Sequence, residues 1–231
     1  MLLKSNLMIE KDFTMSVITI ERKVLAKNDE IAGRNRELFR KNNVFVFNLV
    51  SSPGSGKTSI LERTLEYFNG KVKVAVIEGD VQTDFDAQRI AKHNVPAVQI
   101  VTRSSCHLDA SLIYDALQNI DLKNIQLLVI ENVGNLVCPA NYDLGEAVKI
   151  VVASTTEGDD KPLKYPEMFR NASVIIINKI DLLPYVNCNI KTLRNNALRI
   201  NPRLIIFETS CTTNAGITDW CDWIVKQIPP R

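Results

Sequence analysis

A cysteine stands shortly after the glycine of an acidic switch motif, in the segment Glu131-Asn132-Val133-Gly134-Asn135-Leu136-Val137-Cys138. In nucleotide-binding switches of this type, the backbone of the glycine senses the terminal phosphate. A thiol so close to that glycine is expected to move when the nucleotide changes. Thiolate sulfur is a soft metal ligand, so the segment indicates a metal site tied to nucleotide state.

A second thiol, Cys106, stands directly before His107, one of only two histidines in the chain. Thiolate and imidazole suit Zn²⁺ and Ni²⁺ rather than Mg²⁺ or Ca²⁺. Taken alone, Cys138 would be interpreted as a small buried residue. Because both segments leave the predicted sheet on one side, we expect Cys106, His107 and Cys138 to form a metal site. Water, a further residue or a second chain must complete it, which favours a two-fold interface.

A phosphate-binding loop is indicated by the segment 51–58, which follows a predicted strand and opens a helix. Glycines let consecutive backbone N–H groups wrap a phosphate, a lysine reaches the terminal phosphates, and a hydroxyl holds Mg²⁺. The residues expected to bind the nucleotide here are Gly54, Ser55, Gly56, Lys57, Thr58 and Ser59. Ser51 replaces the first glycine of the common motif. The alternative is a tight strand-to-helix turn with an unrelated lysine.

A guanine-reading motif is indicated by Asn178-Lys179-Ile180-Asp181, after a later predicted strand. The Asp181 carboxylate can accept two hydrogen bonds from guanine, and adenine lacks that pair of donors. A site built on such bonds rejects the analogue strongly, which favours GTP and GDP over adenine nucleotides. Ser210 and Cys211, after the next predicted strand, are expected to offer backbone N–H groups to the base, although Ser-Cys also fits an ordinary loop.

Two carboxylates are predicted at strand ends between these motifs, Asp80 and Glu131. Ligands bind at the carboxyl ends of strands in open α/β sheets. We expect Asp80 and Glu131 to hold Mg²⁺ together with Thr58, and to orient the attacking water. The predicted catalytic residues are therefore Lys57, Asp80 and Glu131; solvated surface carboxylates are the alternative for the last two.

The segments that must position these residues are predicted to be β-strands rich in β-branched residues that alternate with amphipathic helices. The predicted strands are Val44–Val50, Val72–Ile77, Val98–Val101, Gln126–Ile130, Val148–Ala153, Val174–Ile177 and Leu204–Phe207. Helices are predicted around Leu61–Phe68, Asp86–Lys92 and Asp109–Leu117, and after Gly216. Near-continuous apolar strands separated by helices require a sheet covered on both faces. The fold class is therefore α/β, doubly wound, with a mainly parallel sheet.

An N-terminal helix is predicted from Ile18 to Lys41, with Val24, Ile31 and Leu38 at heptad spacing. This stripe either packs on its own domain or joins a partner. The predicted division is an N-terminal segment and helix, 1–41, and a nucleotide-binding domain with an embedded metal site, 42–231. Residues 1–15 show no pattern, and Met15 is an alternative start to Met1.

The bulk composition excludes several classes of protein. A net charge of +2 gives no basis for nucleic acid or an anionic membrane as partner. No stretch has the apolar length of a membrane span, and the N-terminus lacks the pattern of a signal peptide. Five cysteines without an export signal predict reduced thiols in a cytoplasmic protein. Cys188, Cys211 and Cys221 are interpreted as core or loop thiols, and His93 as an ordinary histidine.

Together, these motifs closely resemble the HypB family. The resemblance covers about residues 16–228 and rests on Ser51–Thr58, Glu78-Gly79-Asp80 with Val81-Gln82-Thr83-Asp84, Cys106-His107-Leu108-Asp109-Ala110, Glu131–Cys138 and Asn178–Asp181. HypB proteins are GTPases that help insert nickel into [NiFe]-hydrogenases. The resemblance implies slow GTP hydrolysis, a homodimer favoured by GTP, and cooperation with a HypA-type accessory protein and the hydrogenase large subunit.

The chain departs from the family pattern near its beginning. Many members carry an N-terminal Cys-x-x-Cys-x-Cys nickel site and others a histidine-rich stretch, whereas no cysteine precedes Cys106 here. We therefore expect the nucleotide-linked site to be its nickel site. The alternatives are a urease-type nickel-delivery GTPase, whose Cys-Pro-His motif is not matched, and a non-catalytic carrier assembled by GTP. A partitioning-type ATPase is disfavoured by Asp181.

Overall fold

Seven parallel strands form one sheet at the centre of the computed structural model, which describes residues 13–81, 85–103 and 105–230. The strands are β1 (Phe45–Ser51), β2 (Val74–Asp80), β3 (Ala97–Val101), β4 (Leu127–Glu131), β5 (Val148–Ser154), β6 (Val174–Asn178) and β7 (Ile205–Glu208). Their order is β3-β2-β4-β1-β5-β6-β7, and every neighbouring pair is parallel. The predicted α/β class and all seven predicted strands are confirmed.

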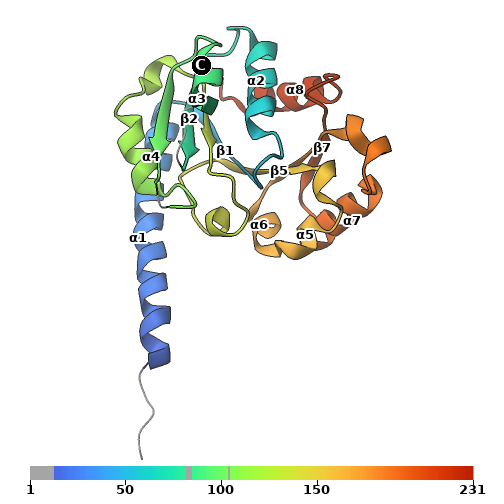
Figure 1. The fold of residues 1–231 in the computed structure, drawn as a ribbon. Helices are drawn as coiled ribbons and strands as arrows, with labels where there is room; N and C mark the ends of the chain where they lie inside the picture. Colours follow the sequence, from blue (N-terminus) through green and yellow to red (C-terminus); the bar gives the residue numbers. More distant parts are fainter. Residues whose placement is uncertain (1–12, 82–84, 104, 231) are drawn as a thin grey trace, which may run out of the picture.

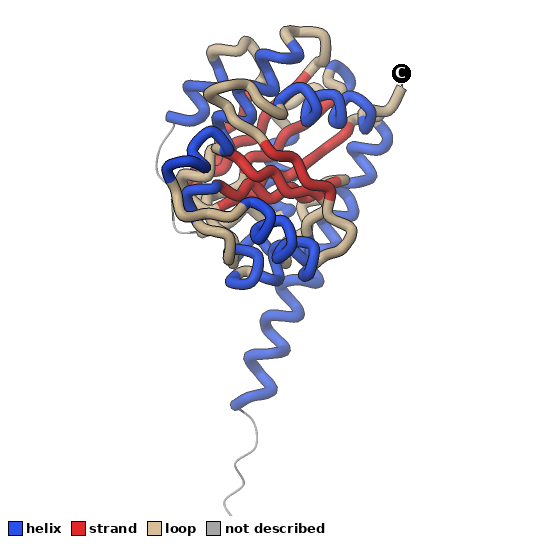
Figure 2. Tube along the Cα trace, turned by 90° about the vertical axis from the view of Figure 1, so that its right-hand side faces the viewer, coloured by secondary structure: helices blue, strands red, loops and turns tan. Residues whose placement is uncertain are grey.

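Helices cover both faces of the sheet, as Figures 1 and 2 show. They are α1 (Phe13–Lys41), α2 (Lys57–Phe68), α3 (Phe85–Ala91), α4 (Ala110–Leu117), α5 (Lys161–Lys164), α6 (Pro166–Asn171), α7 (Ile190–Ile200) and α8 (Ile217–Gln227). One face packs against α2, α3 and α8. The other face packs against α1 and α4 at one end and against α6 and α7 at the other.

The central strand β1 shows why the sequence requires two covered faces. Phe45, Phe47 and Leu49 contribute to the core under α2 and α8, and Trp220 of α8 packs edge-on against Phe47. Val46 and Val50, the alternate residues, contribute to the cores on the opposite face. Because successive strand residues point to opposite sides, a strand that is apolar throughout is stable only between two helical layers.

Helix α1 begins earlier than predicted, at Phe13, and projects well beyond the sheet (Figure 1). Among residues 23–41 of this helix, the buried ones are Asn28, Ala32, Asn35 and Phe39. The predicted heptad stripe lies beside this buried face, because Val24 is 49% exposed while Ile31 and Leu38 are half-buried. The two asparagines displace the apolar stripe, since they hydrogen-bond to backbone groups of the loops beneath the helix.

The carboxyl edge of the sheet gathers the residues expected to do chemistry. Ser51, Asp80, Glu131 and Asn178 are each the last residue of a strand.

The helices α5, α6 and α7 were not predicted from the sequence. Two of them, α5 and α6, are only four and six residues long and show no extended hydrophobic period. None of the helices in the described part of the chain has the length and apolar character needed to cross a bilayer.

Candidate nucleotide and metal site

The segment between β1 and α2 forms the predicted phosphate-binding loop. Gly54 and Gly56 have φ angles of 77° and 98°, which only glycine adopts without strain. A Cβ atom on Gly56 would lie 2.5 Å from Nδ2 of Asn178, so a side chain cannot be accommodated there. Asn178 Nδ2 donates to the carbonyl oxygen of Ser55 at 3.0 Å. The conformation of the loop is thus fixed by close packing against the end of β6.

Lys57 and Thr58, the first residues of α2, are both buried. Lys57 Nζ donates to Ser51 Oγ at 3.0 Å, so the serine that breaks the common motif orients the lysine. Thr58 Oγ1 donates to Glu131 Oε1 at 2.7 Å, which joins the phosphate-binding helix to the switch strand β4. These contacts bring together three of the residues expected to serve the phosphates and Mg²⁺.

A cavity of about 490 Å³ opens in front of this loop and is lined by Asp80, Glu131 and a third carboxylate, Glu78. Glu78 is paired in register with Glu131 on the neighbouring strand and is 2% exposed. Asp80 is predicted from the sequence as a site residue at the end of this strand, whereas Glu78 is not assigned to the site. Hydroxyl and carboxylate oxygens are the ligands that Mg²⁺ prefers, so Thr58 and these carboxylates fit the ion.

Two residues after β5 also contact the phosphate-binding loop, and the sequence analysis missed both. Glu157 Oε2 accepts the hydroxyl of Ser55 at 2.9 Å. Lys161 forms an ion pair with Glu157 at 3.2 Å and donates to Ser52 Oγ at 3.2 Å. Their position after the carboxyl end of a strand was the available signal. Arg89 of α3 lines the cavity as well, and Ser59 Oγ accepts a hydrogen bond from it.

The motif Asn178–Asp181, predicted to read guanine, contacts the phosphate-binding loop. Lys179 Nζ donates to the carbonyl oxygen of Gly54 at 2.7 Å. Asp181 lies at the start of a 3₁₀ helix, Ile180–Tyr185, where it is half-buried. Burial raises the pKa of Cys211 to about 11, Arg63 opposes the rise, and the charge of Asp181 adds to it. Cys211 Sγ lies 3.6 Å from Asn178 Oδ1, so the two segments predicted to read the base are in contact.

The loop at Ser210-Cys211 is stabilised by hydrogen bonds within residues 210–215. The Ser210 N–H donates to the carbonyl oxygen of Ala215 at 3.0 Å, so it already has an acceptor. Ser210 Oγ accepts the N–H groups of Thr212 and Thr213. Of the pair predicted to offer N–H groups to the base, Cys211 is the better placed.

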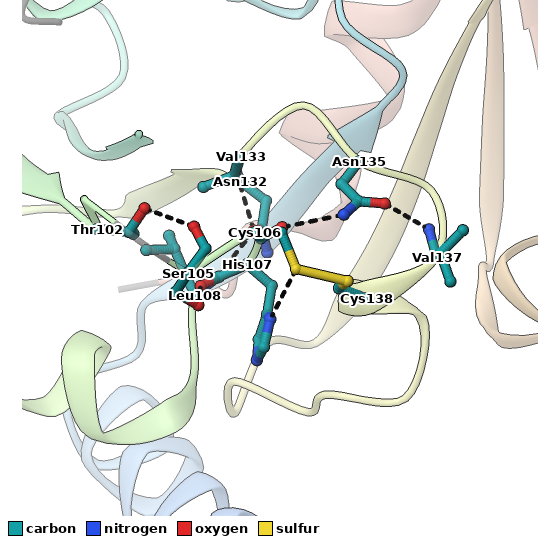
Figure 3. The surroundings of a disulfide bond; sticks show 10 residues. All are labelled: Thr102, Ser105, Cys106, His107, Leu108, Asn132, Val133, Asn135, Val137 and Cys138. Carbon is teal, nitrogen blue, oxygen red and sulfur yellow. Dashed lines mark hydrogen bonds between the residues drawn. A yellow bond between two sulfur atoms is a disulfide. The ribbon is translucent and has the colours of Figure 1, made fainter. Parts of the chain in front are cut away.

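The predicted metal ligands converge, as Figure 3 shows. Cys106, His107 and Cys138 present a sulfur or nitrogen atom each, all within 4.8 Å of one another. Cys106 Sγ lies 3.8 Å from His107 Nδ1. Burial lowers the pKa of His107, with Asp109 opposing the change, and so favours the neutral imidazole that binds metals. The ring packs against that of Tyr142, with centroids 4.0 Å apart and ring planes tilted by 42°.

Cys106 and Cys138 are joined as a disulfide, with Cα atoms 6.3 Å apart. The prediction of reduced thiols is therefore wrong for this pair, whereas Cys188, Cys211 and Cys221 are free thiols. The physical reason is that the fold gathers the predicted ligands of one metal ion, and two cysteines gathered in this way can also pair with each other. In the reduced pair, the hydrogen bond with Cys138 and then burial raise the pKa of Cys106. The same two sulfur atoms can thus bind a metal or each other.

Oxidation by hydrogen peroxide is expected to abolish Ni²⁺ binding at this site. Two thiols and one peroxide molecule give one disulfide and two waters, and neither sulfur then remains as a thiolate ligand. Equilibrium dialysis with Ni²⁺ before and after oxidation measures the loss, and dithiothreitol is expected to restore binding. Unchanged Ni²⁺ binding after loss of both thiols would contradict this prediction.

The ligand loops are fixed by packing around them. Leu108 is fully buried, and a Cβ atom on Gly79 would lie 2.8 Å from its side chain, so this leucine rests on β2 beside Asp80. Asp109 accepts the N–H of Leu112 at 2.9 Å and caps α4. Asn28 of α1 accepts the N–H of Ala110 at 2.9 Å. The segment that carries Cys106 and His107 is therefore held by the sheet and by α1.

Comparison with known proteins places these features in one family. The family model for the nucleotide-binding domain of CobW/HypB/UreG matches residues 45–208. The hydrogenase maturation factor HypB of Azotobacter vinelandii is 50% identical over 215 residues, which cover 93% of this chain and 71% of the relative. The chain belongs to the HypB family. The probable HypB of Methanocaldococcus jannaschii is 42% identical over 93% of this chain and 97% of its own length.

Solved HypB structures share the fold over nearly their whole length. HypB from Archaeoglobus fulgidus superposes with a TM-score of 0.83 at 39% identity, covering 88% of this chain and all of that one. HypB from Helicobacter pylori, solved in complex with nickel, has a TM-score of 0.82 at 40% identity, covering 87% and 94%. A LAO/AO transport system kinase, at 18% identity and a TM-score of 0.56, shares the fold alone.

Proposed function

We propose that this chain is a GTP-hydrolysing metallochaperone that binds nickel or zinc and assists nickel insertion during [NiFe]-hydrogenase maturation. The observation that carries the proposal is the course of the segment 131–138. It begins with Glu131 in the cavity, passes Gly134 against Pro53 of the phosphate-binding loop, and ends with Cys138 among the metal ligands. Membership of the HypB family supports it, as does the nickel complex of the Helicobacter pylori relative.

In the proposed GTPase reaction, the chain stabilises charge on the phosphates and directs a water. Lys57 and the loop N–H groups would bind the phosphates of GTP and GDP, and Asp181 would read guanine. Thr58, Asp80 and Glu131 would hold Mg²⁺, which supplies charge neutralisation when bound. Glu131 and Asp80 would also orient the attacking water. The hydrogen bond between Thr58 and Glu131 supports a shared role at the ion.

Nickel or zinc is the cargo in this proposal, held by Cys106, His107 and Cys138. Three ligands leave a tetrahedral site incomplete, so a water or a second copy of the chain would complete it. We also propose a homodimer favoured by GTP. Its partners would be a HypA-type accessory protein and the hydrogenase large subunit. We also propose the division into an N-terminal segment and helix, 1–41, and a GTPase domain, 42–231.

The direct test compares Ni²⁺ affinity in two nucleotide states. Titration with Ni²⁺ in the presence of GDP, and then of a non-hydrolysable GTP analogue, is expected to give affinities that differ by roughly 5- to 150-fold. By linkage, Ni²⁺ must change the affinity for the analogue relative to GDP by the same factor. Equal Ni²⁺ affinities in the two states would refute the coupling.

Replacing Cys138 with serine is expected to weaken Ni²⁺ binding by more than about tenfold, because a hydroxyl is a poor substitute for a thiolate. GTP and GDP affinities are expected to stay within about twofold of wild type. Cys188→Ser is the matched control, since Cys188 is a free, half-buried thiol outside the site. Loss of GTP binding in Cys138→Ser alone would instead assign Cys138 a structural role.

A urease-type delivery role is the second candidate. It is favoured by one relative, the hydrogenase/urease maturation factor HypB of Helicobacter pylori, which is 39% identical over 97% of this chain. Both roles share the GTPase and the metal site and differ in the protein that receives nickel. Complementation of strains lacking hydrogenase maturation or urease maturation distinguishes them.

A further inference from the structure

Two asparagines of the switch segment reach across to the loop that carries Cys106 and His107 (Figure 3). Asn132 Oδ1 accepts the N–H of Leu108 at 3.1 Å. Asn135 Nδ2 donates to the carbonyl oxygen of Cys106 at 3.4 Å. The two bonds lie on either side of His107. The segment that follows Glu131 therefore holds the backbone of the ligand loop at both ends.

Asn132 is part of a buried polar network. It is 1% exposed, and its Nδ2 donates to Asn48 Oδ1 at 3.3 Å. Asn48 Nδ2 in turn donates to Glu146 Oε1 at 3.3 Å, and Glu146 pairs with Lys149 at 3.9 Å.

Lys149 Nζ donates to the carbonyl oxygens of Pro139, Ala140 and Tyr142, at 3.1, 3.0 and 2.9 Å. The network that begins at Leu108 thus ends on the residues that follow Cys138.

The same segment faces the phosphate-binding loop on its other side. Asn132 directly follows Glu131, which accepts the hydroxyl of Thr58. A Cβ atom on Gly134 would lie 3.2 Å from Pro53, so Gly134 is in close contact with the loop that would hold the phosphates. A change at the terminal phosphate would therefore act directly on a segment that contains both asparagines.

The buried hydrogen bonds of Asn132 favour joint movement of the switch segment and the ligand loop over their separation. A buried donor or acceptor that is left without a partner destabilises the protein. Asn132 Oδ1 also accepts the N–H of Val133 at 3.0 Å, and Asn135 Oδ1 accepts the N–H of Val137 at 2.8 Å. Each side chain is thus anchored to the switch backbone by its oxygen, and it transfers a displacement of that backbone to the ligand loop.

We propose that Asn132 and Asn135 are positioning residues that transmit nucleotide state to the metal ligands Cys106 and His107. This inference rests on the proposed function, because it requires that nucleotide state alters metal affinity. Neither asparagine ligates the metal or contacts the reacting phosphate in this proposal. They act through the backbone at Cys106 and Leu108.

The experiment measures Ni²⁺ affinity with GDP and with a non-hydrolysable GTP analogue in the full chain and in its variants. Asn135→Ala and Asn132→Ala are each expected to reduce the ratio of the two affinities to below about threefold, while nucleotide affinities stay within about threefold of wild type. Asn141→Ala is the matched control, because the exposed Asn141 bonds Asn171 and not the ligand loop.

The outcomes separate this inference from the proposed function. Equal affinities in the wild-type chain would overturn both. A wild-type ratio that both alanine variants retain would overturn the inference alone, and so would equal weakening of Ni²⁺ binding in the two states with the ratio preserved. Should Asn132→Ala fail to fold by circular dichroism, the half-buried Asn135 decides the question, and an unchanged ratio in Asn135→Ala would then refute the proposal.

Discussion

Replacing Lys57 with alanine is expected to lower the rate of GTP hydrolysis by about 10²–10³-fold, the usual cost of removing one preorganised donor to a transition state. Lys57 is 8% exposed and is held by Ser51, so its ammonium group is oriented before any nucleotide binds. Steady-state release of inorganic phosphate measures the change. GTP affinity, measured by isothermal titration, is expected to fall as well.

Lys71→Ala is the matched control for this experiment, because Lys71 is exposed and lies beyond the far end of α2. Hydrolysis at the wild-type rate in Lys57→Ala would contradict the phosphate role of the loop. The same variant tests the non-catalytic carrier, because nickel delivery that persists without hydrolysis would show that GTP serves only to set the assembly.

Replacing Asp181 with asparagine is expected to change the base that the protein prefers. A paired hydrogen-bonding site discriminates against an unmatched analogue by on the order of 10⁴-fold. The asparagine amide would present a donor to the 2-amino group of guanine, whereas xanthine offers an oxygen at that position. We therefore expect GTP binding to weaken by several orders of magnitude and xanthosine triphosphate binding to be gained, as measured by competition with a fluorescent nucleotide.

Asp219→Asn provides the control for this exchange, because Asp219 is an exposed carboxylate in the first turn of α8. An Asp181→Asn variant that binds GTP and xanthosine triphosphate as the wild type does would show that another residue reads the base. Cys211, in the other segment predicted to read the base, would then be the next residue to examine.

The strands could be predicted from the sequence because each is a short apolar run, and the inner strands β1, β2, β4, β5 and β6 are buried on both faces. Their order could not, because local pattern carries no information on which strand pairs with which. The placement of β4 between β2 and β1 is what brings Glu131 beside both Thr58 and Glu78. Tertiary contacts also decided which face of α1 is buried. Asn28 and Asn35 lie on that face because they donate hydrogen bonds to the carbonyl oxygens of Asp143 and Ala110, far along the chain.

What the sequence determined by itself was the local chemistry of this HypB-family chain: the phosphate-binding loop, the guanine motif, and the cysteines and histidine suited to nickel. Each is encoded within a few consecutive residues, because a turn or a ligand pair needs only local geometry. The tertiary structure alone decided that Cys106 and Cys138, which are 32 residues apart, meet closely enough to form a disulfide. It also decided that Asn132 and Asn135 join the switch to the ligand loop, since hydrogen bonds between distant segments arise only when packing brings buried polar groups together.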